Sequence, residues 1–78
     1  MASTNNRKII PIAGMDGSDR ILQELVKDVL KEHGIWSSRE GSVLYDILVY
    51  QEDAEKATQI LATDPRLVGK RIRPLPPR

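Results

Sequence analysis

Residues 19–32 form an amphipathic pattern that leaves few folds open to a chain of 78 residues. Six apolar residues recur there at helical spacing: Ile21, Leu22, Leu25, Val26, Val29 and Leu30. Charged and amide side chains take the opposite side, so we expect a helix of about three to four turns. Ser18 is expected to cap its start, and Gly34 to end it in a left-handed conformation. A helix with so wide an apolar face needs a sheet to cover it.

The rest of the sequence supplies the strands of such a sheet. The expected elements are strands at residues 7–13, 35–39, 42–50 and 70–73, and a second helix at 52–64. Their order, β-α-β-β-α-(β), predicts an α+β domain with the ferredoxin-like split βαβ fold, in which two helices pack on one face of a small antiparallel sheet. That fold places the first strand in the sheet centre, where Pro11 cannot donate to a ladder. A bulge at Pro11, or pairing only through Ile9 and Ile10, would resolve the conflict.

The single domain is expected to span residues 7–73. Residues 1–6 are expected to be disordered, and residues 74–78 to form a Pro-rich basic tail. Residues 40–41 are expected to form the turn between the two middle strands, and Asp53 to cap the second helix.

Composition excludes several classes of protein. The chain has no cysteine, so neither a disulfide framework nor a thiolate metal site is expected. No apolar run approaches the ~20 residues of a membrane span, and the N-terminus lacks the apolar segment of a secretory signal. We therefore expect a cytoplasmic protein with no membrane partner.

Residues 33–50 hold the only histidine, the only tryptophan and both tyrosines of the chain. His33 has no second histidine or cysteine as a partner, so we interpret it as a residue at the negative end of the helix dipole. Ser37 and Ser38 lack a base and an oxyanion site. No catalytic residue, metal ligand or cofactor is therefore expected, and the chain is not predicted to be an enzyme.

Trp36 alternates with Ile35 and is expected to point to the sheet face that no helix covers. If the two middle strands pair as a hairpin, Trp36 joins Leu44, Leu48 and Tyr50 on that face. An uncovered apolar patch marks an interaction surface more often than an accident. The alternative is that Trp36 folds over its own strand end. This pattern favours a non-catalytic regulatory or protein-interaction module, acting as a homodimer or with a protein partner.

Two further segments are candidate sites. The 14–19 loop precedes the first helix, so its glycines and backbone N–H groups can hold a small ligand, although a turn and helix cap accounts for the same residues. The candidate ligand residues in it are Gly14, Asp16, Gly17 and Ser18. In the tail, Arg71, Pro74 and Pro77 have the spacing of a polyproline II ligand. The tail has no aromatic residue to stack on bases, so nucleic acid is not an expected partner.

Two stretches, LQELVKDVLKEHGIWSSREG and YDILVYQEDAEKATQIL, resemble a small ferredoxin-like prokaryotic family of signal-transducing proteins. The shared features are a first helix that ends in Gly34-Ile35, a short hairpin, and a strand that runs into the acidic helix start at residues 52–57. The resemblance covers a little over half of the chain. It implies a role in signal transduction and carries over no catalytic residue or ligand.

A second stretch, GMDGSDRILQELVKDVL, is similar to the glycine-containing loop and first helix of ACT domains. ACT domains share the β-α-β-β-α-β order, dimerise, and bind effectors near that loop. The similarity implies an alternative function, a sensor of a small molecule such as an amino acid or nucleotide. Its ligand residues would be Gly14, Asp16, Gly17 and Ser18.

Overall fold

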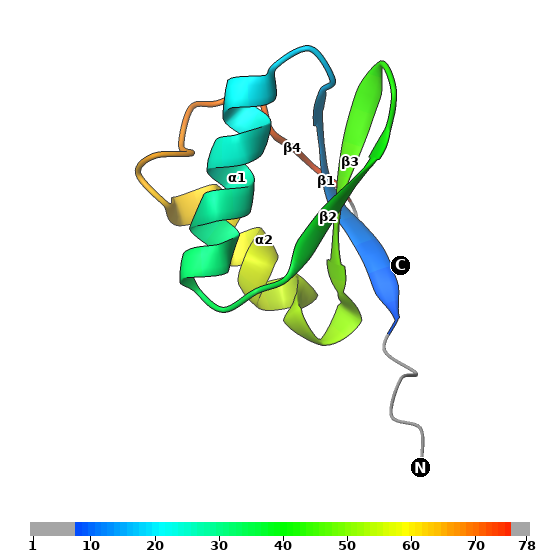
Figure 1. The fold of residues 1–78 in the computed structure, drawn as a ribbon. Helices are drawn as coiled ribbons and strands as arrows, with labels where there is room; N and C mark the ends of the chain where they lie inside the picture. The colour runs from blue at the N-terminus through cyan, green and yellow to red at the C-terminus, as the bar shows by residue number, and fades with distance from the viewer. Residues whose placement is uncertain (1–7, 76–78) are drawn as a thin grey trace.

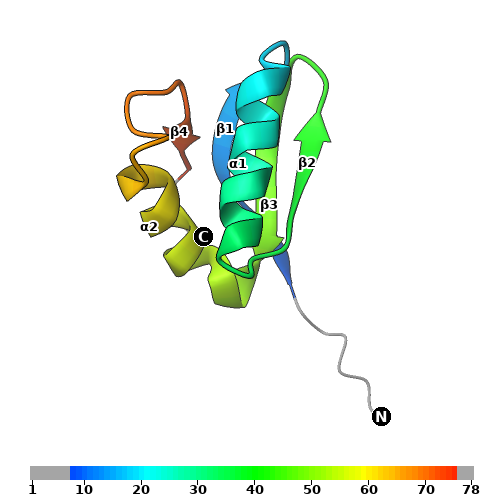
Figure 2. The same ribbon diagram turned by 60° about the vertical axis from the view of Figure 1, so that its left-hand side comes forward.

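A computed structural model describes residues 8–75 of the chain. Its elements are β1 (Ile9–Asp16), α1 (Arg20–Glu32), β2 (Ser37–Gly41), β3 (Leu44–Tyr50), a 3-10 turn η1 (Gln51–Asp53), α2 (Ala54–Thr63) and β4 (Arg73–Pro74). The strands form one antiparallel sheet in the order β2-β3-β1-β4. Both α-helices lie on one face of this sheet, and the opposite face carries no helix of the described chain (Figures 1 and 2). The expected α+β class is confirmed.

Helix α1 begins and ends close to the expected residues, but its N-cap differs. Asp19, not Ser18, is the N-cap, because the Asp19 carboxylate accepts from the Leu22 N–H at 3.0 Å. At the other end His33 is the C-cap, and Gly34 follows with φ of +74°. A side chain with a Cβ would clash in this left-handed conformation, and glycine has none. The expected end of the helix at Gly34 is confirmed.

The core lies between the helices and the sheet. It is made of aliphatic side chains from every layer, with Val26, Val29 and Leu30 of α1 packed among Ile12, Ala13, Met15, Ile35, Ile47, Val49, Ala57, Ile60, Leu61 and Leu67. Two residues of α1 depart from the amphipathic pattern. Ile21 was expected on the apolar face but is 84% exposed, whereas Gln23 was assigned to the polar face and is only 2% exposed.

Pro11 lies in a central strand, and the expected bulge is present there. β1 pairs with β3 along its length, but the register shifts between Pro11 and Ala13. β4 pairs with β1 only at Ala13 and Gly14, so it does not reach Pro11. The proline is therefore accommodated where the ladder is already irregular.

Several element boundaries were wrong by a few residues. β1 continues to Asp16, β2 begins at Ser37 and includes Gly41, and the turn lies at 42–43. Asp53 makes no side-chain cap hydrogen bond to α2. These ends are set by pairing and packing with distant residues, which local sequence does not specify.

The C-terminal strand corrects the expected limit of the domain. β4 contains Pro74, which pairs with Ala13, and the Leu75 N–H donates to the Ile12 carbonyl at 3.0 Å. Residues 74 and 75 therefore belong to the folded domain and not to a separate tail. The expectations for residues 1–6 and for Pro77 lie outside the described residues. Within residues 8–75, no helix is long and apolar enough to cross a membrane.

Candidate functional site: the bare sheet face and two polar clusters

The bare face of the sheet carries an apolar patch built by strand alternation. Ile47 and Val49 of β3 are buried against the helices, so Leu48 and Tyr50 lie on the opposite face. The Trp36 ring stacks on the Tyr50 ring with centroids 4.7 Å apart, and Trp36 is 44% exposed. Three of the four residues predicted for an interaction surface are therefore neighbours.

Two residues of β1 extend this patch. Ile9 pairs with Tyr50 and Pro11 with Leu48, and Ile9 is 49% exposed. The sequence reasoning did not include them, because their position beside Tyr50 and Leu48 follows only from the β1–β3 register. We call Ile9, Pro11, Trp36, Leu48 and Tyr50 the apolar patch.

The fourth predicted residue, Leu44, lies apart from the apolar patch. It stands at the opposite end of β3 and pairs with Asp16. At about 3.3 Å per residue, four positions separate it from Leu48 by roughly 13 Å. Leu44 is exposed, but it does not join the other three in one contiguous surface.

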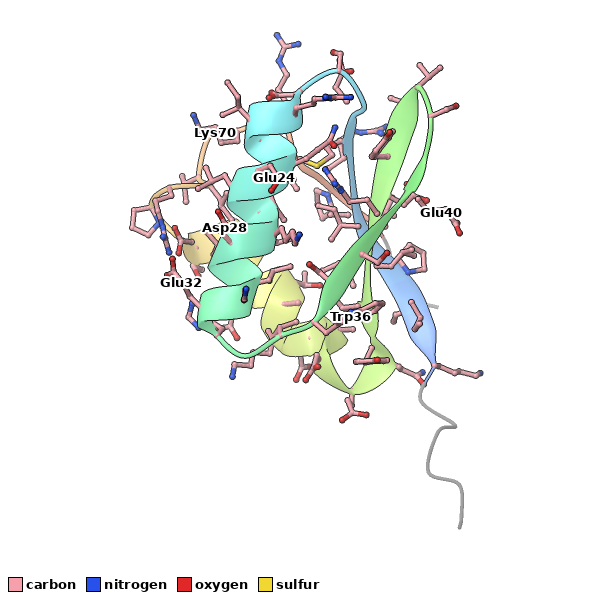
Figure 3. The ribbon with its side chains drawn as sticks, in the orientation of Figure 1. Glu24, Asp28, Glu32, Trp36, Glu40 and Lys70 are labelled. Carbon is pink, nitrogen blue, oxygen red and sulfur yellow. The ribbon has the colours of Figure 1, made fainter. Side chains whose placement is uncertain are left out.

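Between Leu44 and the apolar patch the same face is polar. Asp46 lies opposite Glu40 across the β2–β3 ladder, and Glu40 points away from both helices (Figure 3). Arg73 crosses the sheet at Gly14, because a methyl group there would lie 3.0 Å from Arg73 Nη2 and 3.7 Å from Asp46 Oδ1. Gly14, predicted as a ligand residue, is thus a strand residue that leaves room for a guanidinium.

The remaining residues of the predicted ligand loop form a tight turn. The Asp16 carboxylate accepts from the Ser18 N–H at 2.9 Å and from the Ser18 hydroxyl at 2.8 Å, and these hydrogen bonds lower the pKa of Asp16. The Gly17 N–H donates to the Val43 carbonyl at 2.8 Å, which ties the turn to the hairpin. Asp16 and Ser18 are therefore occupied with each other.

A polar network next to this turn was not foreseen from the sequence. The buried Gln23 amide donates to the Asp16 and Gly17 carbonyls at 3.1 and 3.0 Å, and its oxygen accepts from Arg39 Nη1 at 2.7 Å. Beside it, a cavity of about 450 Å³ is lined by Gly17, Arg20, Gln23, Glu24, Arg39 and Tyr45. Only Gly17 belongs to the predicted loop. Arg39 lies on an edge strand and Gln23 on a helix 16 positions earlier. A contact between residues so far apart in the chain leaves no local pattern in the sequence.

A second polar cluster joins the ends of the two helices. The Arg66 guanidinium donates to both Glu32 oxygens at 2.9 Å and to Asp64 at 3.0 and 3.1 Å. Hydrogen bonds from Arg66 lower the pKa of Glu32 and of Asp64, and the same contacts raise the pKa of Arg66. Each oxygen pair is satisfied by one guanidinium, so this cluster is a structural tie.

The predicted polyproline segment is partly used in folding. Pro74 is in β4, and Leu75 lines an apolar groove of about 640 Å³ between β1 and α2. Pro77 lies outside the described residues, so the motif Arg71, Pro74 and Pro77 stays a prediction. Within residues 8–75, no group of three or more histidine, cysteine, aspartate or glutamate side chains gathers in a geometry that could hold a metal ion.

Comparisons with known proteins do not assign a family. The chain matches no family model, no curated protein and no solved structure. The resemblances to signal-transducing proteins and to ACT domains therefore stay predictions.

Proposed function

We propose that this protein is a non-catalytic regulatory or interaction module with a ferredoxin-like fold, and that it acts as a homodimer through its bare sheet face. The fold proposal is supported by the order β2-β3-β1-β4, which has the first and third strands at the centre and the second and fourth at the edges. A role in cytoplasmic signal transduction is consistent with this proposal.

The observation that carries the functional proposal is the apolar patch. Its aromatic pair, Trp36 and Tyr50, lies beside Ile9, Pro11 and Leu48 on a face without a covering helix. The chain has only three aromatic residues and no phenylalanine, and two of the three, Trp36 and Tyr50, lie outside the core. Contiguous apolar surface of this kind is typical of a contact site.

A second copy of the chain is the occupant that the charges favour. The bare face carries acidic side chains, Glu40 and Asp46, together with the basic Arg73. A face of one sign would repel its own copy, whereas a face of mixed sign can pack on itself across a two-fold axis. Sheets pack face to face at about 10 Å, which suits side chains the size of leucine and tryptophan. The net charge of +1 opposes self-association little.

The alternative function, an ACT-like sensor built on the 14–19 loop, has less support. Gly14 lies within β1, and Asp16 and Ser18 bind each other. Of the residues predicted there, Gly17 lines the cavity beside Gln23.

The test compares the sedimentation velocity of the wild-type protein, Leu48→Asp and Val43→Asp. Leu48→Asp places a carboxylate in the apolar patch, whereas Val43→Asp changes a 79% exposed residue in the hairpin turn, outside the patch. We expect a dimer for the wild type and for Val43→Asp, and a monomer for Leu48→Asp with unchanged circular dichroism. A wild-type monomer that captures a different protein through the same patch would replace the homodimer with a heteromeric module. Dimerisation that survives Leu48→Asp would refute the proposed surface.

A further inference from the structure

The cavity between the first two turns of α1 and the β2–β3 hairpin has the composition of a ligand site. Its walls hold two arginines, Arg20 and Arg39, one carboxylate, Glu24, and the Tyr45 ring. We propose that this cavity binds a small oxyanion, that is, a molecule bearing a carboxylate or phosphate group, and that Arg39 and Arg20 anchor it. The cavity lies on the helix side of the sheet, so the inference is independent of the bare face.

The first argument is the buried amide at the base of the cavity. Gln23 is 2% exposed, and its NH₂ group donates to the Asp16 and Gly17 carbonyls. Because the NH₂ group faces two acceptors, the amide oxygen must face the Arg39 guanidinium, from which it accepts at 2.7 Å. The 16–17 turn thus fixes the Gln23 amide, and the Gln23 oxygen fixes one guanidinium nitrogen of Arg39.

The second argument is the state of Arg39. Ordering a long side chain on ligand binding costs conformational entropy. In this protein, contacts within the fold already order the Arg39 side chain before a ligand binds. Nη1 is engaged by Gln23 and lies 3.6 Å from Glu24 Oε2. Within residues 8–75, Nε and Nη2 of Arg39 donate to no protein group. A guanidinium held at one nitrogen, with other donors open, matches the two oxygens of a carboxylate or phosphate.

The third argument is the position of Arg20. It is the first residue of α1, and the first turn of this helix has no acidic residue. A cation at a helix N-terminus is unfavourable, because the helix dipole places partial positive charge there. In the described part of the chain, the Arg20 guanidinium makes no hydrogen bond or ion pair that would offset this cost. The Asp19 carboxylate caps the helix end itself, so a bound anion would act on Arg20 by contacting its guanidinium.

Charge and size set the class of ligand. Glu24, which lies on the N-terminal half of α1 (Figure 3), is the single carboxylate side chain in the wall and is 58% exposed. Two guanidiniums and one carboxylate leave one positive charge to be matched. A volume of about 450 Å³ falls within the usual range for small-molecule sites. The Tyr45 ring, against which Gly17 packs, offers a flat wall for the body of such a molecule.

The test is a two-dimensional amide NMR titration with sodium phosphate and, separately, sodium succinate, with sodium chloride holding the ionic strength constant. We expect saturable shifts centred on Gly17, Arg20 and Arg39 with at least one of the two anions. Half-saturation at about 1 mM or below corresponds to a few charge-assisted hydrogen bonds. The two titrations distinguish a phosphate ligand from a carboxylate ligand.

Matched variants locate the site. Arg39→Gln and Arg20→Gln each remove one guanidinium, and each is expected to weaken binding roughly 10-fold or more. Lys56→Gln removes one positive charge from the exposed side of α2 and is expected to leave the affinity for the anion unchanged. If Arg39→Gln disturbs the fold through Gln23, Arg20→Gln decides alone, because no described residue binds its guanidinium. Shifts that stay linear with both anions, or binding that Arg20→Gln leaves intact, would overturn the proposal.

Discussion

The Trp36 ring stacks on the Tyr50 ring at a centroid distance of 4.7 Å and an interplanar angle of 27°. Tyr50 in turn pairs with Ile9 across the β3–β1 ladder. The only tryptophan of the chain is thereby fixed at the edge of the apolar patch.

Trp36 fluorescence should report self-association. In the proposed dimer the indole loses water contact, so its emission maximum should move to shorter wavelength as the protein concentration rises. Leu48→Asp should abolish the dependence on concentration, and Val43→Asp should preserve it. A spectrum that does not change with concentration in the wild type would argue against burial of Trp36 in a dimer.

Replacing Gln23 should destabilise the domain. Gln23→Leu removes the hydrogen bonds of the amide to the Asp16 and Gly17 carbonyls and to Arg39 Nη1, which should lower the free energy of unfolding by about 1–3 kcal/mol. The Asp16 carbonyl still accepts from the Asp19 N–H at 3.2 Å. Gln59→Leu, on the exposed side of α2, is the matched control and should change it by no more than about 0.5 kcal/mol. Urea denaturation of both variants measures the difference. Equal stabilities would mean that the buried network contributes nothing.

The Arg66 cluster predicts a loss of stability in acid. The pKa values of Glu32 and Asp64 are lowered in the folded state, so their stabilising contribution is present above the unfolded pKa values. It is lost as pH falls through the folded pKa values, from about pH 5 downward. Arg66→Gln should be less stable than the wild type at neutral pH and should lose less stability on acidification. The curves of unfolding free energy against pH for the two proteins should therefore converge in acid. The Glu32 side chain is 56% exposed and that of Arg66 is 44% exposed, whereas that of Asp64 is only 10% exposed, so we expect salt to weaken the Glu32 pair more than the Asp64 pair. Parallel curves in chemical denaturation from pH 7 to pH 3 would contradict this prediction.

Gly17 should tolerate no side chain. A methyl group there would lie 2.5 Å from the Ser42 carbonyl oxygen and 2.7 Å from that of Val43, and both are backbone atoms. Gly17→Ala should therefore cost about 1–3 kcal/mol of stability. Gly14→Ala is the control, because its methyl group would meet side-chain ends and not backbone, Arg73 Nη2 at 3.0 Å and Asp46 Oδ1 at 3.7 Å, and it should cost far less. Thermal unfolding of the two variants tests the contrast, and equal melting temperatures would contradict the tight turn.

The local elements of this fold could be predicted from the sequence. The spacing of Val26, Val29 and Leu30 predicted α1 and its buried side, and Gly34 predicted where the helix ends. The alternation through Ile47 predicted which face of β3 is buried. Each of these features depends on neighbours within a few residues, which the pattern contains.

The features that depend on distant contacts could not be predicted. Gln23 is buried because Arg39 and the 16–17 turn satisfy its amide, although its place in the helix pattern is polar. Ile21 shares the apolar spacing but lies beyond the edge of the core. Pro11 joins the apolar patch through the bulged register with β3, which no local pattern contains. The patch could therefore be predicted only in part, and the arginine-lined cavity not at all.

The most direct test of the proposed homodimer is a filtered NOE experiment on an equimolar mixture of labelled and unlabelled protein. It detects only contacts between two copies. The proposed homodimer predicts intermolecular NOEs from the Trp36 ring and the Leu48 methyl groups, with none from the exposed side of α1. The absence of intermolecular NOEs at millimolar concentration, or their restriction to the helices, would contradict the proposed homodimer.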